Sequence, residues 1–272
     1  MIYNLKKKTI SILLPTIIVG SAYALSRGVP IMDAVSDGGK HGYWFTYVLW
    51  MLLMVFLSIQ ALFKHFNLSK YYPIAVLGMA VIGYTVTRMP FIHGNYILDC
   101  FSIPSFFNWC PWFAVGVLCK CYQDKFNVLM ANRYFIFMMF IIVVASFYTY
   151  VPQVLIIPAS LFLVYHVFNK LYAENWEFKP IRYGLKFFSK IGTYTMEIYF
   201  LHYFLLFRLP QPVLNYLVEL SERSRRLSFP EFCILGSVAA LICVTCICIT
   251  HILSKVPFLS LLAFGKRTPI KG

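Results

Sequence analysis

The sequence predicts an all-α membrane protein, a polytopic bundle of about eight transmembrane helices with both termini in the cytoplasm. Hydrophobic residues make up 60% of the 272 residues and charged residues only 12%, well below the roughly 25% charged residues of a soluble domain. The apolar residues form continuous runs, whereas a transmembrane β-barrel needs apolar and polar residues to alternate with period two. Basic residues also concentrate in alternate segments between the runs, as expected for loops on the cytoplasmic side.

Eight apolar runs are long enough, or nearly so, to form spans. A transmembrane helix needs about 20 apolar residues, because a rise of about 1.5 Å per residue must cross about 30 Å of hydrocarbon. The third, fourth and seventh runs are shorter, and we expect them to extend through polar flanks or to lie against other helices. The first run lacks a small-residue cleavage site, so we expect a retained helix. The runs are 10–25, 44–63, 72–86, 109–119, 134–147, 151–168, 196–207 and 232–253.

The distribution of basic residues orients these spans. With the N-terminus in the cytoplasm, 17 of the 24 Lys and Arg residues fall on inner segments and 7 on outer segments, as the positive-inside rule requires. The net charge of +14 therefore reflects topology and attraction to the lipid bilayer, and we expect no nucleic-acid partner. One outer cluster departs from this pattern and is interpreted as a solvated amphipathic turn, or alternatively as a contact for an anionic glycan. It comprises Arg223, Arg225 and Arg226 beside Glu219 and Glu222.

The chain shows no internal repeat, low-complexity tract or soluble segment, so we expect a single membrane domain over residues 1–272. The longest inner segment, 169–194, predicts an interfacial amphipathic helix with its cations toward lipid headgroups. Pro15 and Pro158 fall inside apolar runs and predict kinks. The residues of segment 169–194 expected to face the bilayer are Leu185, Phe187, Phe188 and Ile191.

The eight cysteines are interpreted mainly as packing residues. Buried cysteine behaves as a small hydrophobic residue, and a thiolate is unfavourable in hydrocarbon. Cys243 and Cys246 lie three residues apart on one predicted helix, but no His or carboxylate joins them, so we expect no metal site. Cys100 and Cys110 share the outer side, where they either form a disulfide or remain free.

Polar residues within apolar runs mark the candidate functional residues, because a charge near the bilayer centre costs about 2.5 to 3.5 kcal/mol. The seventh run and its flank contain Glu197, His202 and Arg208. His202 is either a histidine that bonds across to a neighbouring helix or a base, proton relay or ligand contact in a reaction cavity. For Glu197 we favour an ion pair that holds a cytoplasmic loop over a place at the entrance for a donor substrate.

Two further places lie at the predicted outer boundary. His41 and Trp44 belong to the stretch HGYWF just before the second span, where a Trp is commonly an interfacial anchor. Arg88 and His93 lie at the outer end of the third span, where they are candidates for binding a sugar or an anionic acceptor.

Three stretches together resemble the acyltransferase 3 family, the membrane-bound O-acyltransferases of cell-envelope glycans. The most specific is FSKIGTYTMEIYFLH at 188–202, whose Gly192, Tyr199 and His202 match the family's late signature. GYWFTYVL at 42–49 is similar to its Trp-Phe helix start, and FNWCPWFAVGV at 107–117 to its Pro-Trp-Phe-x-x-Gly segment. The opening stretch, 1–15, resembles the start of the family's third helix, with Lys8 and Ser11 in the places of two arginines.

The resemblance implies transfer of an acyl group, commonly acetyl, from cytoplasmic acyl-CoA to a sugar hydroxyl of an envelope polysaccharide or glycolipid at a bacterial inner membrane. Acyl-CoA is then a co-substrate and no cofactor stays bound. Because the likeness starts at the family's third helix, we expect a chain that is short at its N-terminus. A glycan or lipid transporter or flippase and an inactive remnant remain alternatives. The candidate catalytic residues are His202 and Glu197, and the candidate substrate-binding residues are Lys8, Ser11, His41, Trp44, Arg88 and Tyr199.

Overall fold

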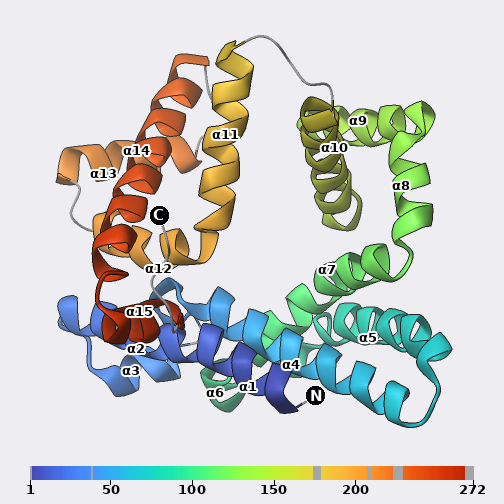
Figure 1. Ribbon diagram of the computed structural model, residues 1–272, viewed down its shortest axis with the longest axis horizontal. Coiled ribbons are helices and arrows are strands. Elements are labelled where there is room, and N and C mark those ends of the chain that lie inside the picture. Colours follow the sequence, from blue (N-terminus) through green and yellow to red (C-terminus); the bar gives the residue numbers. More distant parts are fainter. Residues whose placement is uncertain are drawn as a thin grey trace. The chain divides into compact units, whose positions relative to one another are not determined.

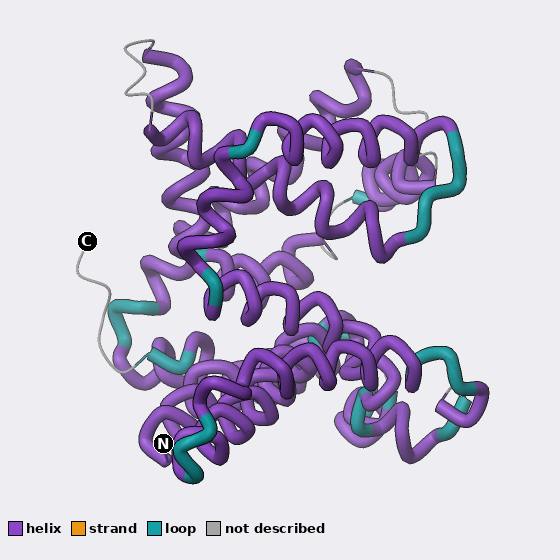
Figure 2. Tube along the Cα trace, turned by 90° about the vertical axis from the view of Figure 1, so that its right-hand side faces the viewer, coloured by secondary structure: helices purple, strands orange, loops and turns teal. Residues whose placement is uncertain are grey.

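The computed structural model confirms the all-helical prediction. It describes residues 2–37, 39–92, 94–173, 179–206, 210–222 and 229–266, and these ranges contain helices and loops but no strand. Figure 2 shows helices joined mainly by short loops. The chain forms two compact units, Met1–Val115 with Tyr194–Gly272, and Gly116–Thr193. The expectation of a single membrane domain stays a prediction.

The first unit contains the N-terminal helices and the C-terminal helices (Figure 1). Within it, α12 packs against α14, while α15 packs against α2. The N-terminal helices are α1 Ile2–Lys8, η1 Thr9–Leu13, α2 Leu14–Ser26, α3 Ile31–Ser36, η2 Lys40–Gly42, α4 Trp44–His65, η3 Ser69–Tyr71, α5 Tyr72–Val86, η4 Pro90–Ile92, α6 Tyr96–Cys100 and α7 Ile103–Cys121, which continues into the second unit. The C-terminal helices are α12 Thr195–Leu206, α13 Gln211–Glu222, α14 Phe229–Leu253 and α15 Pro257–Phe264.

The second unit contains α8 Gln123–Ala131, α9 Arg133–Tyr148, α10 Gln153–Ala173 and α11 Lys179–Thr193. Helices α9 and α10 pack against each other over much of their length. Asn132 separates α8 from α9, and its side chain accepts hydrogen bonds from the N–H groups of Tyr134 and Phe135, which satisfies donors at a helix start. The bend between the two helices is 78°.

Several helices are long and apolar enough to cross a membrane, which makes this a multi-pass membrane protein. In the described residues, three helices qualify, Leu5–Ser26, Trp44–His65 and Cys233–Leu253, and the bent pair α8 and α9 gives a fourth if it forms one span. Each of the other predicted runs also lies largely or wholly on a helix, but those helices are shorter or less apolar. The structure thus confirms several membrane-spanning helices, whereas the number of eight stays a prediction.

Pro15 produces a local change in helix type. The residues before it form the π-helix η1, in which the Leu14 N–H donates to the Thr9 carbonyl, five residues back. A proline lacks an N–H and its ring collides with the carbonyl four residues earlier, and a wider turn relieves both problems. At the second predicted kink, α10 continues through Pro158 without a break.

The predicted amphipathic helix is present as α11, with well-separated polar and apolar faces. Its Phe188 ring lies 5.9 Å from the ring of Phe168 on α10, centroid to centroid. Phe188 therefore contacts a neighbouring helix, although 55% of its surface remains exposed. Residues 174–178, which belong to the same predicted segment, lie outside the described residues.

Candidate functional site

Two tyrosines join the start of α4 to the middle of α12. The Tyr199 hydroxyl donates to the Gly42 carbonyl at 2.5 Å, and the Tyr43 hydroxyl donates to the Phe200 carbonyl at 2.8 Å. Only 1% of the Tyr43 surface is exposed. Burial, reinforced by the neighbouring Tyr23, raises the pKa of Tyr43 far above its ordinary value. The Tyr43 hydroxyl therefore stays protonated and keeps its role as a donor.

Gly42 allows this close approach. Its φ is +100°, in the region that only glycine adopts without strain. The ring of Tyr203 occupies the space in which a Cβ at position 42 would lie. The glycine of the GYWF stretch is thus required by backbone conformation and by the aromatic ring packed against it.

Aromatic rings connect this junction to α7. The ring centroids of Trp44 and Trp109 lie 5.9 Å apart, and Phe45 lies 6.5 Å from Trp109. On its other side Phe45 is 5.5 Å from Tyr199. Residues from each of the stretches 42–49, 107–117 and 188–202 therefore meet in one aromatic cluster inside the first unit, although they are far apart in sequence.

His202 lies beside this cluster, with its ring centroid 4.0 Å from Tyr203 and 5.5 Å from Tyr199. Its Nδ1 is 2.8 Å from the Tyr199 carbonyl and 3.2 Å from that of Ile198. Because carbonyls only accept hydrogen bonds, Nδ1 carries a proton, which leaves the lone pair of a neutral imidazole on Nε2. These bonds lie within α12, whereas one interpretation expected a bond to a neighbouring helix.

The ion pair predicted for Glu197 is confirmed. Glu197 is 2% exposed and pairs with Lys266, which follows α15 near the end of the described chain. The Lys266 amine also lies 5.9 Å from the centre of the Tyr194 ring, and the Tyr194 hydroxyl is 3.3 Å from His251 Nε2. A buried carboxylate needs such a partner. The ion pair therefore links the end of α15 to α12. The catalytic role of Glu197 stays a prediction.

Ser11 is part of a packing contact. Its hydroxyl donates to the Lys8 carbonyl at 3.2 Å, and its Cα lies against Gly265, where any Cβ would overlap the backbone of η1. Gly265 has a φ of +64° and ends α15. Ser11 therefore has a structural role, and its substrate-binding role stays a prediction.

The other candidates are not brought to His202. Lys8 is exposed, and the exposed Arg88 donates to the Tyr84 hydroxyl at 2.8 Å and lies 4.8 Å from the centre of its ring. Within the described residues, no hydrogen bond, ion pair or ring contact joins Lys8 or Arg88 to His202. The side chain of His41, the residues His93 and Arg208, and the cluster of Arg223, Arg225 and Arg226 lie outside the described residues.

The cysteines are free thiols in the described part of the chain. Cys100 and Cys110 are free thiols, so the open question of their pairing is answered by the unpaired form. Lys40 donates to the Cys100 carbonyl at 2.7 Å, and burial lowers the pKa of its amine. No group of three His, Cys, Asp or Glu residues is arranged to hold a metal ion among the residues searched.

The fold defines a helical, multi-pass membrane protein. Comparison of the chain with protein-family models, with curated proteins and with solved structures gives no match. The junction of α4, α7 and α12 around His202 is therefore interpreted from its own geometry.

Proposed function

We propose that this chain is a membrane acyltransferase that moves an acetyl group from acyl-CoA to a sugar hydroxyl of an envelope polysaccharide or glycolipid. The observation that carries the proposal is the meeting of the three family-like stretches. They are distant in sequence, yet Gly42, Trp109 and Tyr199 belong to one connected set of contacts. Residues that serve one reaction must be held together in this way.

His202 supplies the base in this proposal. Nε2 takes the proton of the acceptor hydroxyl while the hydroxyl oxygen bonds to the thioester carbonyl carbon. The C–S bond then breaks, and the proton passes from the imidazolium to the CoA thiolate, which yields the ester and the free thiol. The carbonyls of Ile198 and Tyr199 accept from Nδ1, so they fix the orientation of the ring and stabilise its positive form.

The remaining candidates have supporting roles. The amine of Lys8, with Lys6 and Lys7 beside it on α1, attracts the phosphates of acyl-CoA. Tyr199 and Trp44 provide aromatic surface for the acceptor sugar. Glu197 is a positioning residue, because its ion pair with Lys266 fixes the inner end of α12.

The proposed topology places this chemistry in the bacterial inner membrane. We propose about eight spans with both termini in the cytoplasm, because inner segments contain most of the basic residues. Donor entry then occurs on the side of α1, and the acceptor is reached from the opposite side, near Arg88 and His41.

The experiment is a measurement of CoA thiol release from acetyl-CoA by the purified chain in detergent, with an oligosaccharide present as the acceptor of the acetyl group. His202→Ala is expected to lower the rate about 100-fold, the lower end of what general base catalysis contributes. His166→Ala is the matched control, because the Nδ1 of His166 also bonds to a backbone carbonyl, that of Met130 at 2.9 Å, but in the second unit. Equal rates in the two variants, or no release by the unaltered chain, would contradict the proposal.

The alternative function, a transporter or flippase, is supported by one observation, the bent helix pair α8 and α9. Broken spans form substrate sites in transporters, but they commonly occur in pairs in matching halves of the chain. Among the described residues only one bent pair is present. If vesicles containing the His202→Ala variant still move a fluorescent glycolipid from one leaflet of the bilayer to the other, the transporter is favoured. An inactive remnant predicts neither lipid movement nor thiol release.

A further inference from the structure

A cavity of about 350 Å³ lies beside α4, and none of its seven lining residues is assigned to acyl transfer. One face of α4 forms most of its wall, because Leu57, Gln60, Ala61 and Lys64 follow the spacing that places residues on the same side of a helix. The wall is completed by Leu5 of α1, Ser69 of η3 and Tyr72 of α5. The cavity is thus formed by α1, α4, η3 and α5 of the first unit.

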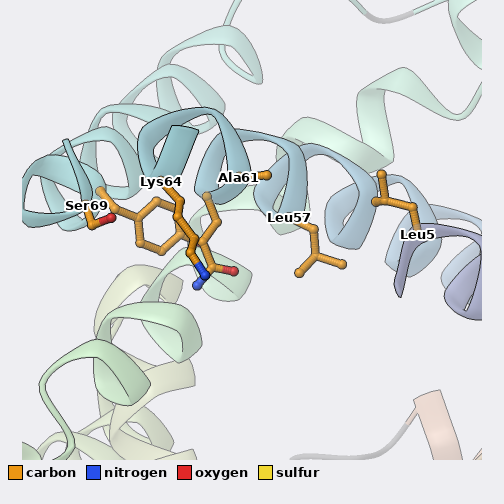
Figure 3. Close-up of a pocket in the computed structure, with 7 residues that line it drawn as sticks. Leu5, Leu57, Ala61, Lys64 and Ser69 are labelled. Atoms are coloured by element: carbon orange, nitrogen blue, oxygen red, sulfur yellow. The ribbon is translucent and has the colours of Figure 1, made fainter. Parts of the chain in front are cut away.

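The lining changes from polar to apolar along α4. Figure 3 shows Ser69 and Lys64 toward one end, Leu57 further along and Leu5 at the other end. Lys64 follows Leu57 by seven positions, a distance of about 10 Å along a helix. Both belong to a helix long and apolar enough to cross a membrane, and Lys64 lies near its C-terminal end. The cavity therefore runs from the polar end of this helix toward its apolar middle.

The surroundings of the cavity are positively charged. Residues 1–32 and 43–98, which supply the whole lining, contain no Asp or Glu, whereas Lys64 belongs to the lining itself. Lys64 is exposed, and its side-chain amine has no hydrogen bond or ion pair with the residues that the structure describes. An amine at the mouth of an apolar cavity, without a partner among the described residues, favours an anionic group from outside the protein.

We infer that this cavity binds an anionic phospholipid, with its phosphate at Lys64 and Gln60 and its glycerol and upper acyl chains beside Ala61, Leu57 and Leu5. Four of the seven lining residues are Leu, Ala or Tyr, which suits an acyl chain better than the largely polar body of CoA. Lys64 lies on a segment assigned to the cytoplasmic side, where anionic lipids attract basic residues. The inference goes beyond acyl transfer and requires only that the protein lies in a membrane.

The test is a titration of the purified full chain with short-chain phosphatidylglycerol, followed by native mass spectrometry, with phosphatidylcholine, acetyl-CoA and inorganic phosphate as parallel ligands. Lys64→Gln is expected to weaken phosphatidylglycerol binding about fivefold, the effect of one basic residue near an anionic headgroup. Ala61→Trp fills the cavity and is expected to remove the bound lipid. Lys70→Gln is the matched control, because Lys70 is exposed, lies 4.9 Å from the Tyr71 ring centre and does not line the cavity.

Each result decides the inference. Selective weakening by Lys64→Gln, with Lys70→Gln unchanged, supports a site for the lipid. Equal weakening in both variants would show general attraction of charge, and equal binding of phosphatidylcholine would remove the role of the phosphate charge. Competition by inorganic phosphate alone, or Lys64-dependent binding of acetyl-CoA in place of the lipid, would overturn the assignment to a phospholipid. Lipid binding is measured without an activity assay, so a negative result here does not affect the test of acyl transfer.

Discussion

The contacts inside the first unit differ in kind from the contacts inside the second unit. In the first unit, the hydrogen bonds of Tyr43 and Tyr199 each join residues 157 positions apart, and the pair Glu197 and Lys266 joins residues 69 apart. In the second unit, the main packing is between α9 and α10, which are consecutive helices. Distant segments thus converge where the candidate site lies, whereas neighbouring helices build the other unit.

This difference has a physical consequence. Contacts between distant residues must offset the entropy of closing a long loop. In the first unit, these contacts include hydrogen bonds and an ion pair of buried polar groups. Such groups are costly when a partner is removed. Substitutions of polar partners in the first unit are therefore expected to have larger effects than comparable ones in the second.

The largest effect is expected from Lys266→Met, which leaves the buried Glu197 carboxylate without its cation. Loss of one member of a buried ion pair is costly, and because Lys266 is 39% exposed we expect about 3 kcal/mol of unfolding free energy, the lower end of the range. Denaturation of the purified protein in mixed micelles measures it. The control is the double variant Glu197→Gln with Lys266→Met, which is expected to recover part of the loss, and a double variant less stable than Lys266→Met would refute the pairing.

Gly42→Ala tests the aromatic junction and is expected to cost about 2 kcal/mol. The added Cβ meets the Tyr203 ring, and the residue keeps a φ of +100°, so overpacking adds to backbone strain. Gly94→Ala is the matched control, because Gly94 has a φ of +76° but no heavy atom within 4 Å of its Cβ position, and strain alone predicts about 1 kcal/mol. Equal destabilisation of the two variants would contradict the close contact with Tyr203.

Asn132→Ala tests whether a change in the second unit leaves the first unit unaffected. It removes the two hydrogen bonds that begin α9, with an expected cost of about 1 kcal/mol. Hydrogen exchange is expected to accelerate in α8 to α10 and to stay unchanged in α12. Faster exchange around Tyr199 and His202 would mean that the two units do not respond separately.

The sequence predicts the helices well where apolar runs are long and bounded by polar residues. The run 72–86 coincides with α5, and Trp44 begins α4 as expected. The sequence pattern does not predict α8, because its composition is too polar to give a clear apolar run. It also does not predict the π-helix before Pro15. Periodicity reports which residues avoid water, but it does not report how a backbone adjusts around a proline.

The sequence points to some residues of the candidate site but not to their partners. Glu197 and His202 are visible because charged or polar groups are rare in apolar runs. Lys266 is one of several basic residues near the C-terminus, and no local pattern separates it from Lys255. The contacts of Trp109 with Trp44 and Phe45 likewise depend on tertiary packing. Partners of this kind follow from the fold and not from spacing.

The most direct test of the central claim is transfer of labelled acetyl groups in proteoliposomes. Labelled acetyl-CoA is added on the side of Lys8, an oligosaccharide acceptor is trapped on the opposite side, and the wild-type chain is compared with His202→Ala and His166→Ala. The account predicts label on the trapped acceptor with wild type and His166→Ala and its loss with His202→Ala. Label that accumulates equally with His202→Ala, or that never reaches the acceptor with the wild-type chain, would contradict the account.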